Sequence, residues 1–132
     1  ALIMSAAVAD AKVANYSDQK IKKENLDVVS FSKNPDILKN LSEKKKPGQV
    51  IVGFAAETIA GLSELQKRGE EKLASKSIDL IYVNNVSDGA VFGSENTQGL
   101  IIDKNHNVIK VPQISKDTLS DILLDQLVSK LG

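Results

Sequence analysis

One carboxylate, Asp10, ends the apolar run "ALIMSAAVAD" and opens a polar segment that carries Lys20, Lys22 and Lys23. A carboxylate at the end of a strand suits Mg²⁺, a hard cation that prefers oxygen ligands and substrate phosphates. Lysines on a mobile loop can follow the moving charge of a triphosphate and close over a site. The same residues can also be a loop-capping aspartate and a solvated run of charge, so both interpretations stay open.

Two further segments offer groups that bind anions. In "KNPDI" (33–37), an extended lead-in and Pro35 at an early helical position precede free backbone N–H groups, which can receive an anion or the polar edge of a nucleotide. Lys72 and Lys76 lie four residues apart on one face of an expected helix, where they can hold phosphates. The structural alternatives are a well-formed helix start and two surface lysines facing the negative end of a helix.

The sequence excludes several other kinds of site. It contains no cysteine, and its one histidine, His106, falls in the turn-like "DKNHN", which is typical of plain surface. Neither G-x-G-x-x-G nor G-x-x-x-x-G-K-[ST] occurs, which disfavours a self-contained dinucleotide or P-loop site. The remaining chemistry is charge stabilisation and the positioning of substrates.

Buried strands alternating with amphipathic helices must position these groups. Apolar and alternating runs predict strands at 1–9 (buried on both faces), 27–32, 49–57 and 78–85, and a hairpin at 99–111. Helices are predicted within 34–48, at 61–75 and at 115–131, with Ser115 as N-cap of the last and a polar flap at 11–25. The apolar faces of the last two helices are predicted to include Leu62, Leu65, Gly69, Leu73, Leu119, Ile122, Leu123, Leu127 and Leu131.

This pattern predicts an α/β fold, a three-layer Rossmann-like arrangement with a mostly parallel sheet, a C-terminal β-hairpin and a final helix. In such sheets ligands bind at the carboxyl ends of the strands, which here are 9–10, 54–58 and 84–85.

Composition limits the class of protein. The 132 residues, 42% hydrophobic and 26% charged, predict a single folded domain over 1–132. The 17 basic and 17 acidic residues balance, so we expect no nucleic-acid partner. No apolar run is long enough to span a bilayer, so we expect no membrane partner and a cytoplasmic location. Because the chain opens directly on an apolar strand, we expect the N-terminal part of the domain to be missing.

Six motifs in a fixed order carry a resemblance to one family. They are "SAAVAD", "KIKK" ten residues after the aspartate, "KNPDIL", "VGFAAET", "KL..K..DLI..N.VS" and a late "F...N" before a strand. The chain resembles phosphopantothenate–cysteine ligase, also called phosphopantothenoylcysteine synthetase. In most bacteria this is the C-terminal half of the bifunctional coenzyme A biosynthesis flavoprotein.

The resemblance implies a reaction and a set of roles. The family activates the carboxylate of 4′-phosphopantothenate with CTP as an acyl-cytidylate and then joins it to cysteine. Lys20 would be the catalytic lysine, and Asp10 would hold Mg²⁺ or the CTP nearby. The implied nucleotide-binding residues are Met4, Ser5, Ala6, Ala9, Asp10, Lys20, Pro35, Asp36, Ile37, Leu38, Phe54, Lys72 and Lys76.

The resemblance also implies partners. A homodimer is expected, with the flap and the strand near 27–32 at its interface. FMN would belong only to a fused or partner phosphopantothenoylcysteine decarboxylase, not to this chain.

The chain departs from the family pattern in three places. Ala11 replaces an aromatic residue, Asn85 replaces an acid, and the family's N-terminal section with its "SN.SSG" stretch is absent. We therefore expect this chain to carry mainly the nucleotide side of the site and to have little or no ligase activity alone. Two other functions stay open, namely a nicotinamide-dependent Rossmann oxidoreductase and a non-catalytic nucleotide-binding or dimerisation fragment.

Overall fold

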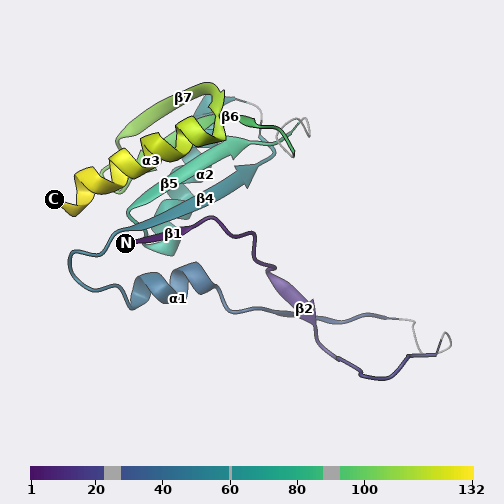
Figure 1. The fold of residues 1–132 in the computed structure, drawn as a ribbon. Helices are drawn as coiled ribbons and strands as arrows, with labels where there is room; N and C mark the ends of the chain where they lie inside the picture. Colours follow the sequence, from purple (N-terminus) through teal and green to yellow (C-terminus); the bar gives the residue numbers. More distant parts are fainter. Residues whose placement is uncertain (23–27, 60, 88–92) are drawn as a thin grey trace.

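A five-stranded sheet lies between helices on its two faces, and a two-stranded arm extends away from it (Figure 1). The computed structural model describes residues 1–22, 28–59, 61–87 and 93–132. The architecture is the three-layer α/β, Rossmann-like fold that the sequence predicts. None of the described helices is long and apolar enough to cross a membrane.

The sheet combines a parallel part with an antiparallel hairpin. Its order is β1-β4-β5-β6-β7, where the strands are β1 Leu2–Met4, β4 Ile51–Glu57, β5 Leu80–Asn85, β6 Asn96–Asp103 and β7 Val108–Ser115. β1, β4 and β5 run parallel, whereas β5–β6 and β6–β7 are antiparallel. Asp103 closes the predicted hairpin, because its Oδ1 accepts the backbone N–H groups of Asn105 at 2.9 Å and Asn107 at 3.0 Å.

Each face of the sheet has its own hydrophobic cluster. Side chains alternate along β5, so Leu80 and Tyr82 join one cluster while Ile81 and Val83 join the other. Helix α3 (Lys116–Leu131) covers the first face with Leu119, Leu123 and Leu127, and α2 (Leu62–Lys76) covers the second with Leu65 and Leu73. Helix α1 (Ile37–Glu43) packs beside α2 through Leu38.

The ends of the two long helices are less buried than predicted. Leu62 is 54% exposed and Leu131 is 47% exposed, because these residues begin and end their helices beyond the packed core. The prediction of Ser115 as the N-cap of α3 is confirmed, because its Oγ accepts the N–H of Thr118 at 3.0 Å.

The first strand is shorter and more exposed than the sequence predicts. β1 covers only Leu2–Met4 and, within the described residues, pairs only with β4. Ile3 is 41% exposed, and residues 5–10 leave the sheet and are exposed. A strand at the edge of a sheet is covered on fewer sides than a central strand, so the apolar composition of 1–9 overstated its burial.

The polar flap forms part of the arm. Strand β2 (Ala11–Val13) pairs antiparallel with β3 (Phe31–Lys33), so the strand predicted at 27–32 begins later and extends further. Residues 23–27 lie outside the described part of the chain. Asn34 fastens the base of the arm, because its backbone N–H donates to Asp10 O and its Nδ2 donates to Ala9 O, both at 2.9 Å.

Gly99 gives a test of the packing between β5 and β6. A Cβ atom at this position would lie 2.2 Å from the backbone oxygen of Val83. We expect Gly99→Ala to lower the free energy of unfolding by about 1–3 kcal/mol, as overpacking does elsewhere. Urea denaturation measures this, and Gln98→Ala, at the exposed neighbouring position, is the matched control. Equal stability of the two variants would contradict the close approach.

Candidate functional site

A cavity of about 650 Å³ brings together residues from four separate segments. It lies beside β1, between α1, β4 and the end of α2, and so flanks the sheet as well as its carboxyl end. Of the predicted nucleotide-binding residues, those that line it are Met4, Ala6, Ala9, Asp10, Pro35, Asp36, Ile37, Leu38, Phe54, Lys72 and Lys76. Their shared location is observed, whereas what they bind stays a prediction.

Ser5 lies on the other side of the sheet from this cavity. Side chains alternate along an extended chain, so Met4 and Ala6 face the cavity while Ile3 and Ser5 line a second cavity of about 560 Å³ on the α3 side. Ser5 thus lines a different cavity from Met4 and Ala6, and the expected role of 4–6, which is to line the nucleotide site with backbone, stays a prediction.

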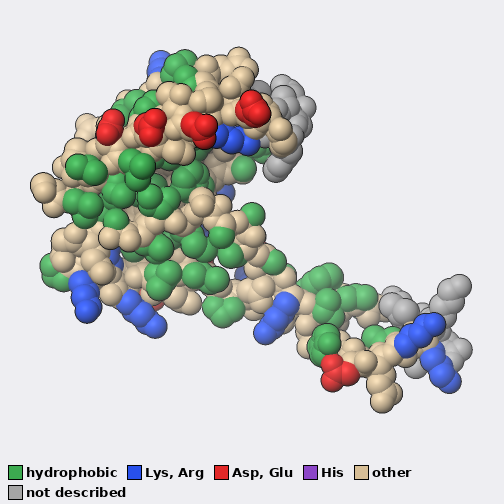
Figure 2. Space-filling view, in the orientation of Figure 1, with side chains coloured by type: hydrophobic (Ala, Val, Ile, Leu, Met, Phe, Trp, Pro, Cys, Tyr) green, Lys and Arg blue, Asp and Glu red, His purple; other side chains and the backbone are tan. Residues whose placement is uncertain are grey.

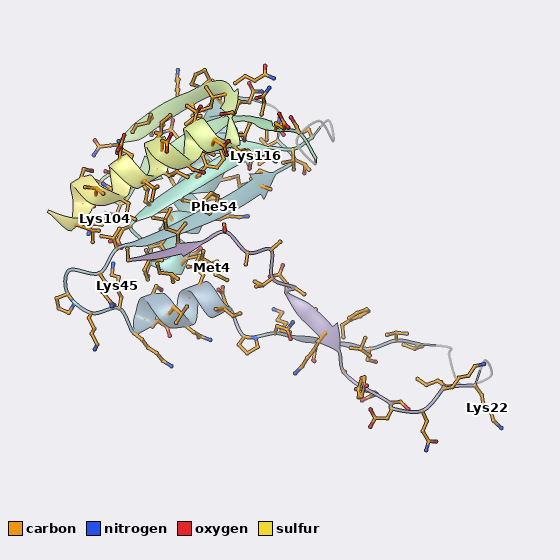
Figure 3. All side chains as sticks on the ribbon, in the orientation of Figure 1. Met4, Lys22, Lys45, Phe54, Lys104 and Lys116 are labelled. Atoms are coloured by element: carbon orange, nitrogen blue, oxygen red, sulfur yellow. The ribbon has the colours of Figure 1, made fainter. Side chains whose placement is uncertain are left out.

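Lys20 is the other predicted residue outside the cavity. It belongs to the exposed arm beyond β2, and Figure 3 shows its near neighbour Lys22 at the far end of that arm. The structure does not bring Lys20 to this chain's own cavity, because the arm extends away from the sheet. Its catalytic role stays a prediction.

The start of α1 differs from the predicted anion site. Asp36 is the N-cap and Pro35 precedes it, so Pro35 is not a helical residue. Asp36 Oδ1 accepts the N–H of Lys39 at 3.0 Å. The carboxylate of Asp36 thus uses the backbone N–H of Lys39, one of the donors that the sequence predicted to be free for an anion. Helix α1 is also short, with only seven residues. The positive charge of the cavity comes from lysines instead.

Each of the two α2 lysines is held by a carboxylate. Lys76 Nζ pairs with Asp36 Oδ2, and Lys72 Nζ lies 2.6 Å from Glu57 Oε1 in an ionic contact outside hydrogen-bond geometry. The hydrogen bond from Lys76, followed by the N–H of Lys39, holds the pKa of Asp36 below its usual value. Both lysines are therefore oriented by exchangeable partners.

Asp10 is also a lining residue of this cavity. Its backbone oxygen is held by Asn34, which fixes the position of the residue. In the described ranges no group of three or more His, Cys, Asp or Glu side chains could hold a metal ion. One carboxylate can still hold Mg²⁺ together with substrate phosphates, which is how this cation is often bound.

Phe54 lies between the two cavities and lines both of them. Its ring is 37% exposed and packs edge-on against Tyr82, with ring centroids 6.2 Å apart. Tyr82 shares a hydrogen bond of 2.7 Å with Thr97, and burial raises the pKa of the Tyr82 hydroxyl. An aromatic surface thus separates a charged cavity from a more apolar one.

Sequence reasoning missed two polar residues of the site. Lys33 lines the charged cavity, and Asn34 both lines it and fastens the 9–10 segment. Both residues belong to the "KNPDI" motif, directly before the predicted residues Pro35 to Ile37, and this position could have indicated them. Asn84 and Asn85, at the end of β5, line two other cavities and so do not join Asp10.

Comparisons with known proteins give the chain its relatives. Residues 1–131 match the family model described as "DNA/pantothenate metabolism flavoprotein C-terminal domain". The coenzyme A biosynthesis bifunctional protein CoaBC of Bacillus subtilis is 36% identical over 130 residues, which cover 97% of this chain and 31% of that protein. The chain therefore spans about a third of the length of such curated relatives.

Solved structures agree with this assignment. The crystal structure of the C-terminal domain of CoaBC is 28% identical, with a TM-score of 0.62, and the match covers 76% of this chain and 46% of that one. A Cab2 mutant in complex with phosphopantothenate-cysteine has a TM-score of 0.53 at 17% identity, covering 82% of this chain and 35% of that one. The second likeness shows the fold alone.

The Asp36–Lys76 pair predicts a pH dependence. In Lys76→Met we expect the pKa of Asp36 to rise toward its usual 3.8, because its main hydrogen-bond donor is lost. A carboxyl whose pKa is lowered by folding stabilises the protein at pH values above its unfolded-state pKa of 3.8. That contribution is lost as the pH falls from 3.8 through the lowered pKa of the folded state. The wild type should therefore exceed the variant in stability near neutral pH, with the difference fading in acid. Carboxyl NMR titration checks the pKa.

Lys72→Met is the matched control, because Lys72 contacts Glu57 instead of Asp36. An unchanged Asp36 titration in Lys76→Met, or the same change in both variants, would contradict the pairing.

Proposed function

The chain belongs to the family of the DNA/pantothenate metabolism flavoprotein C-terminal domain, and we propose that it carries mainly the nucleotide side of a phosphopantothenate–cysteine ligase. The relatives that it matches are coenzyme A biosynthesis bifunctional proteins, which supports this proposal. The observation that carries the proposal is that Asp10 lines one cavity with Lys72 and Lys76, which lie more than 60 residues further along the chain.

The proposed reaction has two steps. A carboxylate oxygen of 4′-phosphopantothenate attacks the α-phosphorus of CTP; a P–O bond forms, the bond to the β-phosphate oxygen breaks, and pyrophosphate leaves. The amine of cysteine then attacks the acyl carbon; a C–N bond forms, the C–O bond to the cytidylate breaks, and CMP and a proton leave. Neither step needs a protein nucleophile, which fits a chain without cysteine.

Lys72 and Lys76 would exchange their carboxylate partners for phosphate oxygens. Lys76 and Asp36 are about a third exposed, so opening the pair costs at most about 1 kcal/mol. A triphosphate offers several negative charges to the same ammonium groups, and charge-assisted hydrogen bonds to it are stronger than neutral ones. The resting pairs would keep both lysines extended toward the cavity before CTP arrives.

Asp10 would hold Mg²⁺ jointly with the phosphates of CTP, and the cation would neutralise charge on them. Phe54 would separate this charged cavity from the second one. The second cavity, which includes Asn84, Thr97 and Lys116, is a suitable place for the acyl substrate to approach.

We place a homodimer interface on the arm. Its exposed apolar side chains include Val13 (46% exposed), Tyr16 (84%) and Phe31 (68%), a density that argues for a protein partner. Figure 2 shows hydrophobic side chains along the arm and basic side chains near its tip. A partner subunit on the arm would also let Lys20 reach a cavity other than that of its own chain.

Family membership favours the ligase over the nicotinamide-dependent oxidoreductase. The other alternative, a non-catalytic nucleotide-binding fragment, would bind the same nucleotide in the same cavity. It would differ from the ligase only in catalysing no reaction. FMN would be bound by a decarboxylase domain, fused or separate, and not by this chain.

CTP binding tests the proposal. With Mg²⁺ present, CTP should raise the thermal unfolding midpoint more than ATP or NADH does, because a ligand of the folded state stabilises it. Lys72→Gln and Lys76→Gln should each weaken CTP binding about tenfold or more, the value of one charge-assisted hydrogen bond. Lys67→Gln is the matched control, because Lys67 is exposed on the same helix and does not line the cavity.

A shift with NADH alone, or equal CTP binding by all three variants, would overturn the assignment. CTP binding without ligation when phosphopantothenate and cysteine are added would favour the non-catalytic fragment.

The dimer has its own test. We expect Phe31→Asp to convert a dimer into a monomer in sedimentation equilibrium, because a charge would be buried at the proposed interface. Val128→Asp on α3 is the control, since Val128 is 63% exposed and lies outside the arm. A monomeric wild type would contradict the proposed dimer. Dissociation of the control variant alone would show that the interface lies on α3 and not on the arm.

A further inference from the structure

A second group of lysines surrounds a separate cavity of about 480 Å³. They come from the loop after α1, the β6–β7 turn and the end of α3, and they are Lys45, Lys46, Lys104 and Lys130. Figure 3 shows Lys45 and Lys104 near one another at the end of the sheet where that turn lies. This cavity shares no lining residue with the candidate nucleotide cavity.

The side chain of Asp79 binds two of these lysines, Lys45 and Lys104. Its side chain is buried; Oδ1 accepts from Lys45 at 2.8 Å and Lys104 at 3.1 Å, while Oδ2 accepts from Lys45 at 2.8 Å and Ile51 N at 2.9 Å. Burial raises the pKa of this carboxyl, but the donors outweigh burial and hold the pKa below its usual value, so Asp79 is ionised. Its roughly four lone-pair sites are all used.

Asp103 is saturated in the same way. Oδ1 accepts the backbone N–H groups of Asn105 and Asn107, and Oδ2 accepts from Asn107 Nδ2 at 3.0 Å and from Lys130 at 2.8 Å. Neither carboxylate of the cluster can accept a further hydrogen bond.

The lysines retain donors that these carboxylates do not use. An ammonium group carries three N–H donors, and in the described chain Lys104 gives a hydrogen bond only to Asp79 and Lys130 only to Asp103. Lys45 and Lys104 pair with Asp79, Lys130 pairs with Asp103, and Lys46 lines the same cavity, so four lysines accompany two carboxylates and the cluster keeps an excess positive charge. Lys45 alone would compensate the buried Asp79, so the other lysines exceed what burial of that acid requires.

We propose that this cavity is a second anion-binding site, which takes a small ligand carrying two or more phosphate groups. The charged groups of the cluster retain only donors and positive charge, so a ligand that binds them must bring acceptors and negative charge. Lysines on three separate segments suit a ligand with several phosphate oxygens, because each ammonium acts as a movable point charge. The proposal is independent of the proposed ligase function.

Inorganic pyrophosphate is the probe, followed by ¹⁵N NMR. The starting protein is the full chain with Lys72→Gln and Lys76→Gln, which removes the lysines of the first cavity. We expect saturable shifts in the amides of Lys46, Gly48, Gln49 and Asn105. Adding Lys46→Gln and Lys104→Gln, two exposed positions, should weaken this binding at least about tenfold.

The control adds Lys39→Gln and Lys44→Gln instead, which removes the same charge from exposed positions outside the cavity. Retained saturable binding there, and in a Lys104→Arg variant, supports a specific site. The proposal is overturned if the shifts do not saturate, if sodium chloride at equal ionic strength reproduces them, or if Lys46→Gln with Lys104→Gln leaves them unchanged. CTP binding by the wild type is measured separately, so failure here leaves the ligase proposal intact.

Discussion

The buried carboxylate of Asp79 ties together the segments on which both cavities depend. It accepts the N–H of Ile51 at the start of β4, its own backbone oxygen accepts the N–H of Lys104 in the hairpin turn, and its side chain holds Lys45 just after α1. A buried charge that loses its partners costs about 3–5 kcal/mol, so this arrangement strongly favours one position of the loop after α1. Because α1 and its N-cap supply Leu38 and Asp36 to the candidate site, that position also shapes the site.

The candidate site is almost neutral in charge without a ligand. Lys72 and Lys76 face Glu57 and Asp36, while Lys33 and Asp10 lie on the same cavity. Such a site is less costly to fold than an unpaired cluster of cations, because like charges are not left facing each other. It also sets a condition on the ligand, which must carry enough negative charge to replace carboxylates that are already in place. A triphosphate meets that condition better than a dinucleotide does.

Two features of the structure point beyond a single isolated chain. The edge strand β1 leaves Ile3 exposed, and the arm leaves Tyr16, Val28 and Phe31 exposed. Isolated apolar residues on a surface need no explanation, but an extended arm covered by them does. The relatives are about three times as long as this chain. The exposed edge and the arm therefore leave apolar surface uncovered in the described part of the chain.

The sequence by itself determined the features that depend on short-range patterns. The helices, the central strands, the hairpin and the Ser115 cap follow from periodicity and from local hydrogen bonding. Tertiary structure alone decided which residues face each other. The pleat of the chain put Ser5 and Met4 on opposite sides, the extension of the arm took Lys20 away from the cavity, and the four lysines around Asp79 met only through contacts between distant segments. Short-range patterns contain no information on such contacts. Bringing distant segments together costs conformational entropy, and only the packing of the whole core offsets that free-energy cost.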